Sequence, residues 1–143
     1  PWCRRRWQII SKPRAFTGAK QCDGGEGMRV DFNQMQEMTL PCPHQGTGQM
    51  SLRAYVGQGE KLVSCTIHPG GSIGLHSHPS SDDLHFVLMG TGVAICDGEE
   101  ELLEPGVCHI CKKGSAHSIQ NTGLGDLVLL TVEVGPEEKG EIG

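Results

Sequence analysis

Four side chains in this sequence have the types and spacing of ligands for one divalent metal ion: His76, His78, Asp83 and His117. On an extended segment successive side chains alternate between faces, so His76 and His78 point the same way and can bind one ion. The Pro-Ser-Ser segment 79–81 predicts a loop, and Asp83 then opens an apolar run that ends at Gly90. A hairpin of this kind folds Asp83 back toward the two histidines.

His117 lies in a second segment, 106–121, whose pattern is strand, glycine turn, strand. It is far from His76 and His78 in the sequence, so only the tertiary fold can bring the three imidazoles together. Taken alone, the pair of His76 and His78 is equally typical of a surface loop. The presence of Asp83 and His117 at suitable places favours a metal site.

Together the two segments resemble the paired motifs of the cupin superfamily, Gly-x5-His-x-His-x(3,4)-Glu-x6-Gly and Gly-x5-Pro-x-Gly-x2-His-x3-Asn. The matching positions are Gly70, His76, His78, Asp83 and Gly90, then Gly106, Gly114, His117 and Asn121. Asp83 replaces the usual Glu, and Lys112 replaces the usual Pro. The resemblance covers about residues 50 to 134. It implies an all-β fold, the double-stranded β-helix or jelly-roll barrel.

The acidic position and its neighbours leave alternatives open. Asp83 is one methylene shorter than Glu, so it binds the metal directly, binds through water, or leaves a three-histidine centre. Asp82 also fits the looser motif spacing, but the six-residue gap to Gly90 selects Asp83. His85 shares the face of Asp83, which makes it a candidate proton carrier, support for the ligands or substitute ligand. The alternative for His85 is a histidine packed in the barrel wall.

Arg53 and Tyr55 share one face of an early predicted strand. If that face lines the barrel, we expect both residues to line the pocket, with Arg53 holding a substrate carboxylate. In related small cupins, residues at corresponding positions of this strand often line the pocket. If the face points outward, both are ordinary sheet surface, and the sequence does not decide between the two.

Composition favours a single all-β domain. The chain has 143 residues, with 21 glycines and eight prolines between short apolar runs. We interpret residues 1–27 as an N-terminal arm and residues 28–143 as one barrel domain. Part of the arm is open to interpretation as a cloning remnant. A strand is expected at 28–32 and a loop at 40–48. Further strands are predicted at 51–56, 61–68, 74–78, 83–89, 93–96, 101–103, 108–111, 117–121 and 127–134.

Charge and cysteine content bear on partners and location. The net charge is −5, although residues 1–20 hold six of the twelve cations. The rest of the chain has no basic stripe or stacking motif, so we expect no nucleic-acid partner. No apolar stretch reaches the roughly 20 residues of a membrane span, so we expect no membrane association. Seven cysteines, an odd number without a secretory signal, favour free thiols and a cytoplasmic protein.

A centre of three histidines and one carboxylate leaves a position for substrate, and its donors suit one Mn, Fe, Ni, Co or Zn ion per chain. The resemblance implies a small metal-dependent cupin, a group with dioxygenases, decarboxylases, lyases and isomerases acting on small oxygenated acids and sugars. The leading hypothesis is such an enzyme with a small-molecule substrate. The alternative is a non-catalytic sensor module that binds a metal or small ligand. The resemblance also implies a homodimer, with residues 28–56 at the interface.

Overall fold

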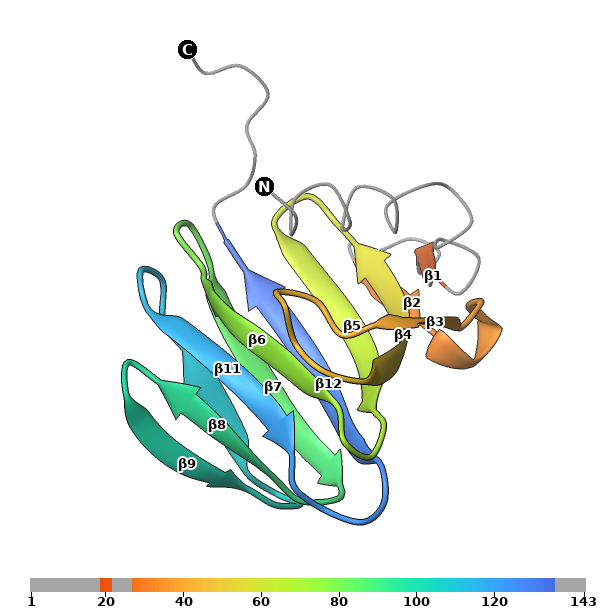
Figure 1. Ribbon diagram of the computed structural model, residues 1–143. Coiled ribbons are helices and arrows are strands. Elements are labelled where there is room, and N and C mark those ends of the chain that lie inside the picture. Colours follow the sequence, from red (N-terminus) through yellow and green to blue (C-terminus); the bar gives the residue numbers. More distant parts are fainter. Residues whose placement is uncertain (1–18, 22–26, 136–143) are drawn as a thin grey trace.

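β-strands are the main regular structure in the described part of the chain, as the computed structural model in Figure 1 shows. The structure describes residues 19–21 and 27–135. Within them a short 3-10 turn spans Phe32–Gln34. The strands are β1 Ala19–Gln21, β2 Met28–Val30, β3 Met38–Pro41, β4 Gln49–Val56, β5 Glu60–Ile67, β6 Ser72–Ser77, β7 Asp82–Met89, β8 Gly92–Cys96, β9 Glu99–Leu103, β10 Cys108–Cys111, β11 Ala116–Asn121 and β12 Leu127–Val134.

Two antiparallel sheets face each other and enclose the core (Figure 1). The larger sheet has the strand order β10-β7-β12-β5-β4-β3, and the smaller has the order β6-β11-β8-β9. The two motif segments lie side by side in this arrangement. β10 pairs with β7 in the larger sheet, and β11 pairs with β6 in the smaller one. The fold therefore brings His117 to the strand that carries His76.

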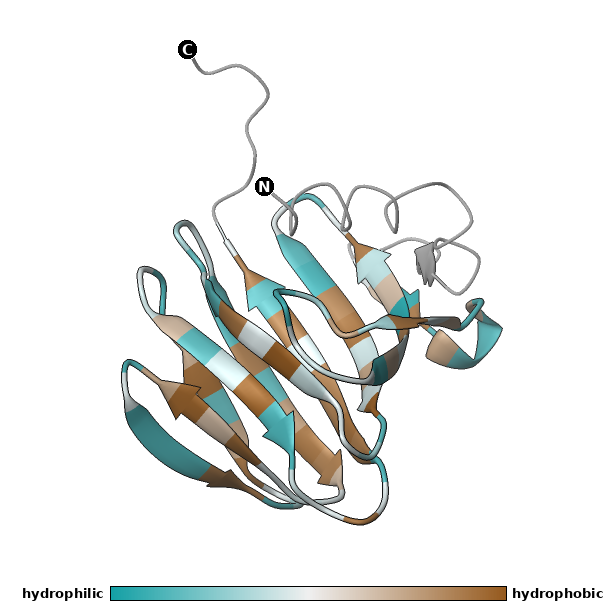
Figure 2. Cartoon of the chain, viewed as in Figure 1, coloured by the Kyte–Doolittle hydropathy of each residue, from teal (hydrophilic) through white to brown (hydrophobic). Residues whose placement is uncertain are grey.

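The inward faces of the two sheets supply the core. Buried and partly exposed residues alternate along β5 and β12, as expected of strands with one buried face. Figure 2 shows the same alternation as bands of brown and paler residues along the strands. Burying each large aliphatic side chain contributes roughly 1.5–3 kcal/mol, so this cluster holds the sheets together. Its members are Cys42, Met50, Leu52, Ala54, Val63, Cys65, Ile67, Ile73, Val87, Ala94, Leu103, Ile119, Leu127 and Leu129.

Every strand predicted between residues 51 and 134 is present, with ends shifted by one or two residues. Two predictions nearer the N-terminus are also confirmed with ends shifted by two residues. The strand expected at 28–32 ends at Val30, because Asp31 accepts a hydrogen bond from the backbone of Asn33 and starts the 3-10 turn. The loop expected at 40–48 begins inside β3, which pairs with β4. The division into an arm and a domain stays a prediction, since most of residues 1–27 lies outside the described part.

Candidate metal centre

The four predicted ligands meet at one end of the barrel interior and come from both sheets. His76 on β6 and His117 on β11 are directly opposite each other in the smaller sheet. His78 follows β6, and Asp83 lies near the start of β7 in the larger sheet. One potential ligand atom from each residue lies within 4.8 Å of the others. Asp82 instead accepts a hydrogen bond from the backbone of the β10–β11 turn at 2.9 Å.

The spacing of these donor atoms fits a first-row metal ion. The Nε2 atom of His117 is 3.1 Å from that of His76 and 3.2 Å from that of His78. The Asp83 Oδ2 atom is 3.1 Å from His78 Nε2 and 3.3 Å from His117 Nε2. Two donors bound to one ion at about 2.1 Å lie about 3.0 Å apart at a right angle and about 3.4 Å apart at a tetrahedral angle. These four donor pairs therefore lie at the distances that adjacent ligands of one ion require.

Hydrogen bonds on the far side of the rings fix which nitrogens face the centre. His76 Nδ1 is 2.8 Å from the carbonyl oxygen of Gly74, so Nδ1 carries the proton and Nε2 is bare. His109 Nδ1 donates to a Glu101 carboxylate oxygen at 2.6 Å, which leaves His109 Nε2 as an acceptor. His117 Nδ1 donates to that nitrogen at 2.9 Å, so its own Nε2 is also bare.

Two bare imidazole nitrogens therefore point at each other across 3.1 Å, from His76 and His117. Lone pairs at this separation repel unless a cation lies between them. The partners on the far side of the rings also hold each imidazole in the orientation that a metal ligand needs. The residues present thus fit a divalent metal ion on the chemistry of the donor set as well as on its spacing.

Burial and mutual contacts set the charge states of the ligands. Burial lowers the pKa of His76 to about 3, and it also lowers the pKa of His117. Burial acts in the same direction on His78, but the hydrogen bond and the charge of Asp83 outweigh it and raise the pKa of His78. For Asp83, burial alone would raise the pKa, but contacts with His117, His78 and His85 bring it well below its usual range. Asp83 is therefore ionised, and His78 is the ligand that takes up a proton most readily.

His85 supports the acidic ligand from inside the barrel wall. Its Nε2 donates to Asp83 Oδ2 at 2.6 Å, and its Nδ1 lies 2.8 Å from the Thr131 hydroxyl. Since an ionised carboxylate only accepts, Nε2 carries a proton, and the Thr131 hydroxyl is the partner of Nδ1. The ring is 4% exposed, so it is held rigidly. His85 thus orients Asp83 toward the histidine ligands.

A pocket opens beside the ligands. It is lined by Pro43, His44, Met50, Lys61, Val63, Cys65, Ile73, His76, His78, Asp83, His85, Thr131 and Glu133. Besides histidines and Asp83, its lining has the polar side chains of Lys61, Thr131 and Glu133, and the other side chains are apolar. A small molecule in this pocket would therefore have one end at the ligands and its carbon skeleton against apolar side chains.

No motif in the sequence identifies His44 as a site residue. Its ring stacks on that of His76, with centroids 4.1 Å apart and an interplanar angle of 10°. The His44 backbone has a φ of 59°, which is uncommon for a residue other than glycine. The loop is pinned to β6, because Gly74 donates to the Pro43 carbonyl and a Cβ at Gly74 would lie 1.9 Å from the His44 carbonyl oxygen. The fold thus places a fourth imidazole at the pocket mouth.

The structure does not bring Arg53 and Tyr55 to this pocket. On β4 it is Met50, Leu52 and Ala54 that join the core cluster, so Arg53 and Tyr55 lie on the opposite face. Arg53 forms an ion pair with Glu37 there, at 3.6 Å. The basic residue that lines the pocket is Lys61, on the neighbouring strand β5. The sequence did not identify Lys61 as a pocket residue. Which face of a strand points inward depends on the strands beside it and on the opposite sheet.

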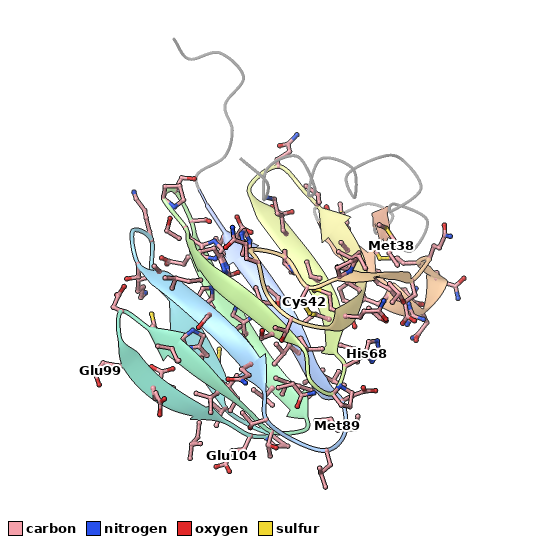
Figure 3. All side chains as sticks on the ribbon, in the orientation of Figure 1. Met38, Cys42, His68, Met89, Glu99 and Glu104 are labelled. Atoms are coloured by element: carbon pink, nitrogen blue, oxygen red, sulfur yellow. The ribbon has the colours of Figure 1, made fainter. Side chains whose placement is uncertain are left out.

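A second polar cluster lies away from the pocket. The Ser51 Oγ and His68 Nε2 atoms are 2.7 Å apart, and His68 Nδ1 is 3.0 Å from an Asp126 carboxylate oxygen. This connectivity is that of a Ser-His-Asp triad. However, the Thr39 hydroxyl lies 2.9 Å from that of Ser51, which is buried beside the edge strand β3. The cluster therefore ties β4 to the turns that follow β5 and β11, and Figure 3 shows His68 at that end of the barrel.

The comparisons with known proteins agree with this fold. A model of the cupin domain matches residues 63–133. An oxalate-binding protein of Thermotoga maritima is 28% identical over 114 residues, covering 76% of this chain and 94% of that protein. The crystal structure of a predicted oxalate decarboxylase, also from Thermotoga maritima, superposes with a TM-score of 0.70 at 24% identity and covers 74% of this chain and 97% of that one.

The fold extends to much more distant proteins. The Cnp3 cupin domain of Schizosaccharomyces pombe has a TM-score of 0.62 at only 9% identity, over 82% of this chain and 84% of that one. At this identity the likeness shows the fold alone. With the match to the domain model and both motifs in place around one cluster, the chain belongs to the cupin superfamily.

Proposed function

We propose that this chain is a metal-dependent enzyme that acts on a small oxygenated acid, with His76, His78, Asp83 and His117 holding one divalent transition metal ion. The observation that carries the proposal is the convergence of bare imidazole nitrogens and one carboxylate at ligand spacing, beside a pocket. The names of the two Thermotoga proteins refer to oxalate, which supports an acid as the substrate class. When bound, an ion of this kind polarises a carboxylate or carbonyl oxygen as a Lewis acid.

The chain's own residues would bind, orient and shield the substrate. The Glu101–His109 pair orients His117, and His85 orients Asp83. Aliphatic side chains around the pocket would keep water from the carbon skeleton of the acid. Proton movement at His85 remains part of the proposal, because its ring also lines the pocket. Arg53 and Tyr55 have no part in it, because they lie on the other face of β4.

The test is a turnover screen on protein loaded separately with Mn, Fe, Ni, Co or Zn. Small oxyacids, with oxalate and malonate among them, would be followed by carbon dioxide release, oxygen uptake and product analysis. These readouts distinguish decarboxylase, dioxygenase, lyase and isomerase chemistry. We expect turnover with at least one metal, and its loss in His78→Ala. Turnover that is unchanged in His78→Ala would contradict the assigned centre.

The second candidate is a non-catalytic module that binds a small acid through the same centre. It is favoured by one observation, that a relative covering most of this chain is named for oxalate binding. The same screen separates the two candidates. Tight binding of an acid to metal-loaded protein, without product from any of the five metals, would establish the binding module and contradict the enzyme.

The proposal extends to assembly and location. We propose a homodimer, supported by β3, which lies at the edge of the larger sheet within the predicted interface 28–56 and leaves one side open for pairing. Light scattering on the purified chain tests it. A cytoplasmic location is supported by the free thiols of the five described cysteines, Cys42, Cys65, Cys96, Cys108 and Cys111. No helix in the described part of the chain has the length and apolar character of a membrane span.

A further inference from the structure

We propose that the pocket selects an acid with two anionic groups, one held at the metal centre and the other at Lys61. The inference rests on the proposed function and narrows it to small di-acids. Lys61 carries the only ammonium or guanidinium group among the described residues that line the pocket. A carboxylate that reaches the pocket rim therefore has one fixed positive charge to bind besides the metal centre.

Lys61 is aligned with the metal centre by strand register. Glu133 on β12 pairs directly with Lys61 of β5 on one side and with Asp83 of β7 on the other. Directly paired residues project to the same face of a sheet, and for these three that face is the pocket. Two strand spacings, about 10 Å, separate the backbones of Lys61 and Asp83. A lysine side chain and a short di-acid span that distance together.

The contact that Lys61 makes with Glu133 is weak enough to exchange. Its Nζ atom lies 3.7 Å from Glu133 Oε1, and the two side chains are 32% and 20% exposed. A partly exposed ion pair of this geometry contributes little to stability. Ser81 donates to the same Glu133 oxygen at 3.0 Å, so Glu133 keeps a hydrogen bond when Lys61 turns to a bound anion. The contact with Glu133 therefore costs little to give up.

Glu133 lies in register between Lys61 and Asp83, and apolar side chains line the pocket next to Lys61. Val63 follows Lys61 on the inward face of β5, and Ile73 comes from the opposite sheet. These side chains suit the methylene groups of an acid and offer no partners for the hydroxyl groups of a sugar. A metal centre at one end of the pocket, Lys61 at the other and apolar side chains beside them suit a short di-acid.

Calorimetry on the metal-loaded full chain tests the proposal with pairs of acids of equal carbon number. The pairs are malonate with propionate and succinate with butyrate. For at least one pair we expect the di-acid to bind roughly tenfold more tightly, because a charge-assisted contact contributes about 1.5 kcal/mol or more. Lys61→Met should remove this preference while leaving mono-acid and metal affinity within about twofold. Lys61→Arg should retain it, and Glu133→Gln should increase it.

The outcomes separate this proposal from the one it rests on. A di-acid preference that survives in Lys61→Met would overturn the role of Lys61, as would wild-type protein that binds both members of every pair equally. In either case metal-dependent binding of acids would still stand. If neither kind of acid binds the metal-loaded wild-type protein, the proposed function fails and the di-acid site fails with it.

Discussion

The two ends of the barrel interior differ in chemistry, although the same strands build both. On β5 the inward face begins with Lys61 and ends with Ile67, and on β12 it passes from Leu129 to Glu133. β7 changes in the same way from Asp83 to Val87, and β11 changes from His117 to Ile119. Figure 3 shows the inward side chains filling the space between the sheets, with Cys42 among them, while Glu99 and Glu104 project from the outer edge.

The difference shows how one small fold separates stability from chemistry. Strand alternation decides which residues face inward. Strand register decides which of them lie at the same height along the barrel, and we call each such set of inward residues a level. The apolar level buries its side chains completely and supplies the driving force for folding. The polar level contains buried histidines that the core does not need. It is compatible with folding because nearly every ring nitrogen there has a defined contact.

The sharpest way to separate the two levels is to remove a side chain from the apolar one. Leu129 is fully buried in the core, so Leu129→Ala should lower the free energy of unfolding by about 2–5 kcal/mol. The metal affinity of the folded protein should change by no more than about twofold, because no contact at the ligands is lost. Urea unfolding of metal-free protein measures the first quantity, and competition with a chelator measures the second. A large loss of metal affinity would show that the two levels are coupled.

The hydrogen-bonded pair behind His117 offers a smaller perturbation from the polar side. Removing a partner that orients a metal-bound histidine typically lowers affinity 10–100-fold, so we expect a fall of about that size for His109→Leu. Glu101→Gln should lower it less, because the amide still accepts from His109. Glu99→Gln is the matched control, since Glu99 is an exposed carboxylate on the same strand. If Glu101→Gln and Glu99→Gln lower the metal affinity equally, the effect would come from surface charge and not from the orientation of His117.

Proton competition at the polar level gives the smallest effect. The pKa of His78 is raised above its ordinary value of about 6.5, whereas those of His76 and His117 are lowered. A metal must displace the proton from His78, so affinity should fall as the pH drops below the raised pKa. Below that pKa the metal affinity should fall by up to about tenfold per pH unit, which is the dependence for the displacement of one proton. Above it the metal affinity should not depend on pH. Metal affinity measured by chelator competition at a series of pH values checks this. Displacement of two or three protons near neutral pH would contradict these charge states.

Much of the barrel and the ligand set could be predicted because both depend on local patterns. Short apolar runs between glycine turns gave the strands, and fixed motif spacing identified the four clustered residues. The missing parts depend on contacts between strands distant in the sequence. The Glu101–His109 pair joins β9 to β10, and the position of His44 depends on a loop pinned against β6. The other sheet covers only one side of β4 and β5. That side decides that Lys61 points inward and Arg53 points outward.

Metal content is the most direct test of the central claim, that His76, His78, Asp83 and His117 hold one ion. Purified wild-type protein, His76→Ala and His78→Ala would be compared by elemental analysis after reconstitution with metal and dialysis. Circular dichroism would confirm that each variant is folded. We predict about one transition metal ion per chain in the wild type and loss of that ion in both folded variants. No metal in the wild type after reconstitution, or full occupancy in both variants, would contradict the account.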